Sequence, residues 1–197
     1  MNIAHHEISI STGTTGNRVI TLRKILHVLL LTGIPFFALT QSRAETMPKS
    51  LMGHWRVSDV RLDTTFTRSP YYNYNDRRLM GRKVLFTADA VKGNFPEKTE
   101  CLGPTVRNEI TSLNSLLERT MGNQEDQSQE DAAKRYQLQS DGRKEVQVVW
   151  VGCEKGDLGP DSPFGPESFN WIAILSKNKI AMRWYDNTVL LLKREQR

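Results

Sequence analysis

The clearest alternation of hydrophobic and polar positions lies in the last third of the chain. Three apolar segments, residues 169–175, 179–185 and 188–193, are separated by the short polar stretches 176–178 and 186–187. Turns of this length join neighbouring antiparallel strands, so the pattern predicts a meander. Alternate residues of the middle strand share a face, with Ile180, Met182 and Trp184 on one side and Ala181, Arg183 and Tyr185 on the other.

Further strands are expected upstream of this meander. The apolar positions of residues 54–63 change parity once, which predicts a strand with a β-bulge near Ser58 and Asp59. The parity change leaves two orientations open for Asp59, one that turns the carboxyl group inward and one that leaves it outside at the bulge. Shorter apolar runs predict strands at residues 83–87, 136–139 and 145–153.

One segment has the spacing of a helix. Residues 108–121 carry apolar side chains at helical intervals, with Asn108 placed as an N-cap and Gly122 after the end. The remaining segments are interpreted as connections: a long loop at 64–82 with a helical turn at 76–80, a turn at 89–96, a solvated excursion at 123–130 and an irregular stretch at 154–167. Some seven strands and one lateral helix predict a mainly β fold, either an antiparallel meander barrel or a strongly twisted sheet.

The first 44 residues have the layout of a secretory signal peptide. Arg23 and Lys24 precede a mostly apolar run that ends at Leu39, and small residues stand at the minus-three and minus-one positions of a cut after Ala44. An uncleaved anchor is the competing interpretation, but the run is shorter than the span of about 20 residues that crosses a bilayer. We therefore expect cleavage, a single domain at residues 45–197, a periplasmic or secreted location and no permanent membrane anchor.

Cleavage changes the charge balance. The whole chain has 27 Lys and Arg against 22 Asp and Glu, a net charge of +5. The segment removes four basic residues and one acidic residue, which leaves 23 basic and 21 acidic residues, or +2. A nearly neutral exported protein is a poor candidate for binding nucleic acid. In an oxidising compartment Cys101 and Cys153 are expected to form a disulfide, the alternative being two buried thiols that never meet.

The candidate chemistry is sparse. The chain has no nucleophile-elbow, zinc-protease or phosphate-loop motif, and His54 is the only histidine after position 44. A Ser-His enzyme needs a histidine base, and a zinc or copper site needs further Cys or His ligands. His54 stands at the start of a strand, where a rim position is expected. We therefore expect a protein that is not an enzyme and that has no cofactor and no metal.

The first and last predicted strands carry a recognisable set of residues. Gly53, His54 and Trp55 begin the first strand, and Lys193 and Arg194 end the last. This set resembles the lipocalins and the wider calycin group, and residues 79–87 (LMGRKVLFT) are similar to bacterial secreted lipocalin-like small domains. The resemblance implies a barrel in which Trp55 lies at the closed end beneath Lys193 or Arg194. The lipocalin Thr-Asp-Tyr signature before the seventh strand is missing, so the looser calycin-like fold is expected.

Two groups of side chains are candidates for ligand or partner binding. Tryptophans on predicted strands fit the lining of a ligand cavity, and core packing explains them as well; they are Trp150, Trp171 and Trp184, beside the structural Trp55. The loop at 64–82 instead gathers Tyr and Arg, the residue types enriched in binding hot spots: Tyr71, Tyr72, Tyr74, Arg77 and Arg78, with Arg68 nearby. An ordinary loop folded across a barrel end is the alternative.

Two functions from different classes follow. In the first, a lipocalin-like barrel binds a small apolar ligand in its interior. In the second, the protein is an inhibitor or an immunity-type factor that binds an extracytoplasmic protein through loop 64–82. A cavity of roughly 300 Å³ or more lined by Trp and Leu favours the first function. A filled barrel with residues 71–78 projecting favours the second, and the sequence alone leans towards the first.

Overall fold

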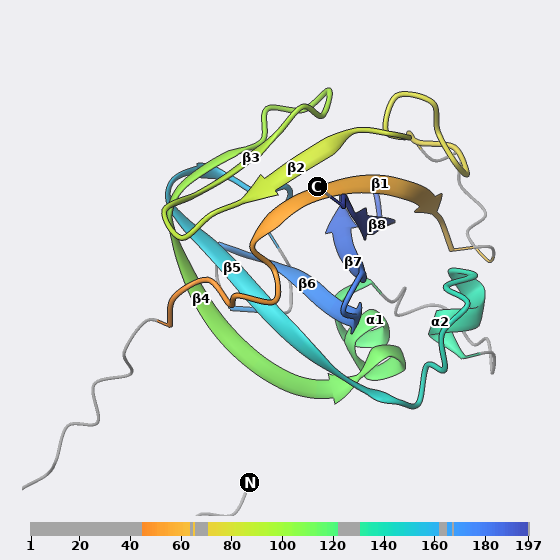
Figure 1. Ribbon diagram of the computed structural model, residues 1–197. Helices are drawn as coiled ribbons and strands as arrows, with labels where there is room; N and C mark the ends of the chain where they lie inside the picture. Colours follow the sequence, from red (N-terminus) through yellow and green to blue (C-terminus); the bar gives the residue numbers. More distant parts are fainter. Residues whose placement is uncertain are drawn as a thin grey trace, which may run out of the picture. The chain divides into compact units, whose positions relative to one another are not determined.

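The computed structural model describes residues 45–63, 65, 71–121, 131–161, 165–166 and 168–196. The expected signal peptide, Arg68 and the polar stretch at 123–130 lie outside these residues. Within the described part, strands follow one another in chain order around a closed antiparallel barrel (Figure 1). The predicted mainly β meander barrel is therefore confirmed.

The barrel has eight strands: β1 (Gly53–Arg61), β2 (Lys83–Phe86), β3 (Ala90–Gly93), β4 (Glu100–Ser112), β5 (Glu145–Asp157), β6 (Phe169–Ser176), β7 (Lys179–Trp184) and β8 (Thr188–Arg194). Two short helices, α1 (Leu113–Met121) and α2 (Ala132–Arg135), connect β4 to β5. The barrel closes because β1 pairs with β2 on one side and with β8 on the other. No helix in the described part of the chain has the length and apolar character needed to cross a bilayer.

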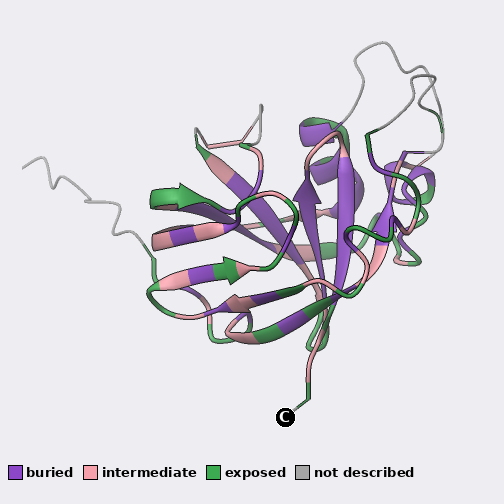
Figure 2. Ribbon diagram, turned by 90° about the horizontal axis from the view of Figure 1, so that it is seen from above, coloured by how far each residue is buried: buried purple, intermediate pink, exposed green. Residues whose placement is uncertain are grey.

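Buried side chains form two clusters, and Figure 2 shows buried positions recurring along the strands and the helices. Every strand contributes to the first cluster, which is therefore the barrel interior. Its largest fully buried members are Trp55, Trp184, Tyr72, Phe86, Met47 and Leu51. The second cluster packs α1 and α2 on the outer wall of β5 to β8, through residues that include Leu113, Leu117, Trp150, Trp171, Val189 and Leu191. The predicted faces of β7 are confirmed, with Met182 inside and Ala181 outside.

The bulge in the first strand is confirmed. The register between β1 and β8 shifts between Val57 and Asp59. Asp59 pairs with Leu191, whose side chain belongs to the outer cluster. Its carboxylate accepts a hydrogen bond from the Arg61 guanidinium at 2.6 Å. Asp59 thus points outward, and the inward orientation is wrong.

The predicted helix at 108–121 begins too early. Residues 108–112 continue β4, which pairs with β5 as far as Ser112. The helix starts at Leu113, and the Ser112 hydroxyl accepts a hydrogen bond from the backbone N–H of Ser115 at 3.1 Å. Asn108 is therefore not an N-cap, because pairing with a long neighbouring strand overrides a local helical spacing.

Three shorter predictions also fail. The expected turn at 89–96 contains β3, and the expected irregular stretch at 154–167 begins with the end of β5. The barrel has eight strands rather than seven, because β3 and β4 are additional and the strand expected at 136–139 is absent. The expected strand at 136–139 is the turn that follows α2. Its residues alternate between buried and exposed positions as a strand would, but Gln137 and Gln139 have φ angles of 50° and 42°, which no strand adopts.

The predicted disulfide is confirmed. Cys101 on β4 is bonded to Cys153 on β5, with an S–S distance of 2.04 Å. The bond closes a loop of 52 positions that contains both helices. It therefore ties the two longest strands of the barrel together on either side of their helical connection.

Candidate functional site

The closed end of the barrel has the arrangement that the lipocalin resemblance implies. The Arg194 guanidinium lies 4.2 Å from the centroid of the Trp55 ring. The indole Nε1 donates a hydrogen bond to the Leu51 carbonyl at 2.7 Å, and Arg194 donates to the Met52 carbonyl at 2.6 Å. Lys193 is exposed, so Arg194 is the basic partner. Trp55 is therefore fully buried beneath Arg194 where the first and last strands meet.

Large buried side chains fill much of the barrel interior. Trp184 contacts Phe95 and Tyr185 near the opposite end, with ring centroids 4.5 and 5.3 Å apart. Two pockets stand out among the described residues, with volumes of about 180 and 260 Å³, and tryptophan lines neither of them. The smaller pocket lies at the end of β5. It is lined mainly by polar groups, including Asp157, Asp161 and Asn170, and by three residues that belong to the interior cluster or pack against it, Val151, Cys153 and Leu158. Its polar lining is unsuited to an apolar ligand.

Two of the candidate tryptophans lie outside the barrel. Trp171 donates from Nε1 to the Thr120 hydroxyl at 2.9 Å, and Trp150 donates to Glu109 at 2.8 Å. Both indoles are buried in the outer cluster beneath α1. They therefore share no cavity with Trp184, and core packing accounts for all three.

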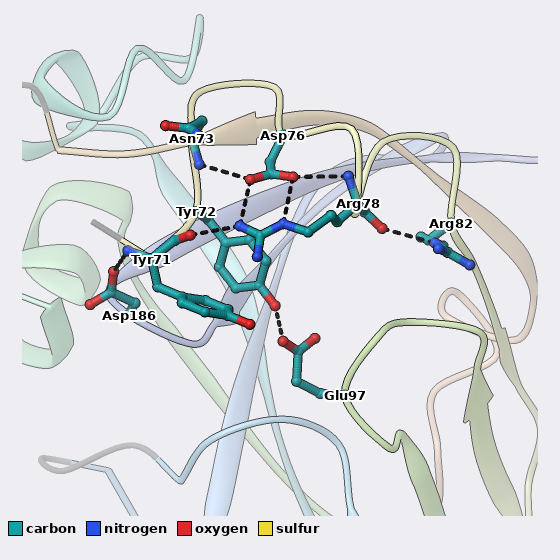
Figure 3. A network of polar contacts seen from close by, with 8 residues as sticks. All are labelled: Tyr71, Tyr72, Asn73, Asp76, Arg78, Arg82, Glu97 and Asp186. Carbon is teal, nitrogen blue, oxygen red and sulfur yellow. Dashed lines mark hydrogen bonds and ion pairs between the residues drawn. The ribbon is translucent and has the colours of Figure 1, made fainter. Parts of the chain in front are cut away.

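In the described part of the loop between β1 and β2, Asp76 links residues 73–78 to one another (Figure 3). Its carboxylate accepts backbone N–H groups of Asn73 and Arg78 at 3.0 and 2.9 Å. The Arg78 side chain donates to both carboxylate oxygens, at 3.0 and 2.8 Å. The hydrogen bond from the Arg78 side chain, helped by the two backbone donors, lowers the pKa of Asp76 well below its usual range. In turn, Asp76 raises the pKa of the Arg78 guanidinium.

Arg78 also gathers the neighbouring aromatic rings. Its guanidinium lies 4.6 Å from the Tyr71 ring centroid and 4.7 Å from that of Tyr72, as Figure 3 shows, and it donates to the Tyr71 carbonyl at 2.6 Å. Arg82 donates to the Arg78 carbonyl at 2.9 Å and to the Asn94 carbonyl at 3.1 Å. The loop is thus tied to itself and to the β3–β4 connection.

Two side chains fasten the loop to the barrel. Tyr72 is fully buried in the interior cluster, where its hydroxyl donates to Glu97. Asn75 pairs with Val60 of β1 through its backbone N–H and its side-chain oxygen, each at 3.0 Å. Asn75 has a φ angle of 48°, a left-handed conformation that asparagine tolerates better than most residues. These contacts fasten the middle of the described loop to the barrel.

The two remaining tyrosines of the loop face solvent. Tyr71 is 64% exposed and Tyr74 is 47% exposed, which makes them two of the exposed large hydrophobic residues of the described chain. The Arg61 guanidinium lies 4.5 Å from the Tyr74 ring centroid and holds that ring in place. Arg77 and Arg78 are exposed beside them. The predicted Tyr and Arg cluster is therefore a surface, with Tyr72 as its buried anchor.

The larger pocket adjoins Tyr74. It has a volume of about 260 Å³ and is lined by Tyr74, Ala133, Lys134, Gln137, Leu138, Gln139 and Ser140. A buried ion pair between Arg135 and Asp63, at 3.3 Å, holds this segment against the end of β1. In this segment Gln137 and Gln139 have left-handed backbone conformations, which are strained for residues other than glycine or asparagine. Backbone strain of this kind concentrates at functional sites.

No family model, curated protein or solved structure matches the chain. The site therefore has to be interpreted from its own residues. In the described part of the chain, no three His, Cys, Asp or Glu side chains come together as a metal-binding group. What the residues 71–82 and 133–140 do offer is an exposed aromatic and basic surface beside a pocket.

The sequence indicated half of this surface. Clustered Tyr and Arg residues identified loop 64–82, but the contribution of the turn after α2 was missed. That turn carries no motif, and its alternating pattern was interpreted as a strand. The only signal available was its polar and amide-rich composition, Lys134, Gln137, Gln139 and Ser140.

Proposed function

We propose that the mature chain is an exported, non-catalytic protein-binding module. Its binding surface, here the Tyr74 face, consists of Tyr71, Tyr74, Arg77 and Arg78 together with Lys134, Gln137 and Gln139 around the adjoining pocket. The observation that carries the proposal is the exposure of Tyr71 and Tyr74 on a loop locked by Asp76 and Arg78. Tyr and Arg dominate binding hot spots, and a preorganised loop loses little conformational freedom on binding.

The packed interior supports this function over ligand binding inside the barrel. A calycin-like barrel that holds an apolar ligand needs a cavity lined by apolar side chains. Here Trp55, Trp184 and Phe86 are each at most 1% exposed and fill that space themselves. The Tyr74 face, in contrast, offers large apolar area that is already in contact with water.

The charges on the Tyr74 face favour an acidic partner surface. Arg77 and Lys134 are exposed, and neither contacts an acidic group in the described part of the chain. Arg78 is 42% exposed and is partly neutralised by Asp76. Two uncompensated positive charges beside two tyrosines suit a protein surface that carries carboxylates.

Capture from a periplasmic extract tests the proposal. The variant Tyr74→Ala/Arg77→Ala removes one aromatic and one basic contact, whereas Tyr72 is unsuitable because it belongs to the core. The matched control, Lys49→Ala/Lys177→Ala, removes two exposed lysines elsewhere on the surface. Since a hot-spot residue contributes about 2 kcal/mol or more, the Tyr74 face variant should bind the captured partner at least about tenfold more weakly.

The control variant should bind like the wild type, and raising the salt concentration should weaken the wild-type complex. Equal affinities of the wild type and the Tyr74→Ala/Arg77→Ala variant, with both proteins folded, would exclude the Tyr74 face as the binding surface.

A further inference from the structure

β4, one of the two longest strands of the barrel, has one edge that its neighbour β3 covers only in part. β3 pairs with β4 only at Glu100, Cys101 and Leu102, whereas β4 continues to Ser112. On its other side β4 is paired with β5 over this whole distance. Figure 1 shows β4 running on past β3 towards α1. Among the described residues, the second half of β4 is therefore paired with a strand on one side only, and an isolated bridge at Val106 lies on the other side.

The backbone groups on this side can be assigned from one hydrogen bond. The N–H of Glu45 donates to the Val106 carbonyl at 3.3 Å, in an isolated antiparallel bridge. The Val106 carbonyl therefore points away from β5, and alternation along the strand directs the N–H and C=O groups of Asn108 and Ile110 the same way. None of these four groups has a hydrogen-bond partner in the described part of the chain.

The side chains leave the edge accessible. Ile110 is 63% exposed. Together with Tyr71 and Tyr74 it is one of the exposed large hydrophobic residues of the described chain. Natural proteins protect such edges with Lys, Pro or a bulge, because an uncovered edge is a template for another strand. Residues 106–112 (VRNEITS) contain neither Lys nor Pro, and their pairing with β5 has no bulge. The two charged side chains of this segment are engaged elsewhere: Arg107 lies over the Phe169 ring, and Glu109 accepts hydrogen bonds from Arg119 and Trp150.

We infer that this edge pairs with the same edge of a second copy of the chain, antiparallel and about a two-fold axis. An antiparallel arrangement of two identical edges is self-complementary, so that every unpaired N–H meets an unpaired C=O. The site is separate from the Tyr74 face, and the inference does not rest on the proposed function.

The register of this pairing follows from the residues. Glu45 already occupies the position opposite Val106, so the second copy has to pair beyond it. A residue whose backbone N–H and C=O groups point to the edge must lie opposite a residue of the same kind in the second copy. A pairing centred on Glu109 places two carboxylates opposite each other, which is unfavourable. Centring on Ile110 places Ile110 opposite Ile110 of the second copy, and Asn108 opposite its Ser112.

The test is the oligomeric state of the exported protein, measured by analytical ultracentrifugation over a wide concentration range. The wild type should form dimers as its concentration rises. Ile110→Pro removes an N–H that the barrel does not use, and Ile110→Lys adds a charge at the centre of the pairing; both should remain monomeric with an unchanged fold. Tyr71→Lys, a matched change at another exposed hydrophobic residue, should still dimerise.

Covalent trapping checks the register. Directly opposite residues of a hydrogen-bonded antiparallel pair have Cα atoms about 5.5 Å apart, within the range that a disulfide spans. Ile110→Cys should therefore form an intermolecular disulfide on oxidation, and Tyr71→Cys should not. A wild type that stays monomeric at every concentration would overturn the inference, as would a dimer that persists in Ile110→Lys or that traps equally well through Tyr71→Cys.

Discussion

At the scale of single residues, neighbouring side chains of one type have opposite roles. Tyr71 and Tyr72 are adjacent in sequence, yet the first is 64% exposed and the second is fully buried. The sequence indicated that the aromatic residues cluster, but it could not assign them, because the loop has no periodicity that separates an inner from an outer face. That assignment depends on Asp76 and Arg78, whose bonds fix the path of the chain between the two rings.

Asp76→Asn should destabilise the protein by about 1–2 kcal/mol at neutral pH, because the amide cannot replace a carboxylate that accepts from Arg78. The folded state lowers the pKa of Asp76, so the carboxylate stabilises the fold above its ordinary pKa of about 3.9 and ceases to do so as the pH falls below that value. Urea unfolding of both proteins should show a difference at pH 7 that shrinks below about pH 4. The exposed Asp89→Asn is the control, and a difference that is independent of pH would contradict this role.

Trp55→Ala should cost about 3–5 kcal/mol of unfolding free energy, as a truncation of a fully buried aromatic side chain. It also removes the ring beneath Arg194 and the hydrogen bond to Leu51. Chemical denaturation measures the loss. A variant whose unfolding midpoint matches that of the wild type would show that the closed barrel end does not depend on Trp55.

At the scale of elements, the sequence predicted best where neighbouring strands are joined by tight turns. β6, β7 and β8 appear within one or two residues of their predicted limits, because an alternating pattern and a short turn leave one arrangement. The prediction for the end of β4 failed because the apolar residues of 108–121 have a helical spacing, whereas residues 108–112 pair with β5 in the folded chain. The prediction missed β3 because this strand has four residues, ends at Gly93 and is followed by Pro96, which leaves too few positions to show a period.

Cys101→Ser/Cys153→Ser should lower the unfolding free energy by about 4 kcal/mol. The reason is that the unfolded chain regains the conformational entropy that the closed loop of 52 residues removes. The released loop contains both helices, so the outer cluster should lose its protection as well. Hydrogen exchange of α1, followed together with global unfolding, measures both effects. Wild-type stability in this double variant would show that β4 and β5 are held by their pairing alone.

At the scale of the whole molecule, architecture was predictable and function was not. A meander, a bulged first strand and the set of Trp55 with a basic last strand all point to one closed barrel. The Tyr74 face joins loop 71–82 to the turn after α2, two segments more than fifty positions apart, and the ion pair of Arg135 with Asp63 holds the second segment near the end of β1. Such a surface has no linear pattern in the sequence.

The central claim is that a partner protein occupies the Tyr74 face, and photo-crosslinking in the exporting cell tests it most directly. A photoreactive aromatic residue is introduced in place of Tyr74 and, separately, in place of the exposed Lys177 as a control. We predict one discrete adduct with a second protein from position 74 and none from position 177. No adduct at position 74, or the same adduct from both positions, would contradict the account.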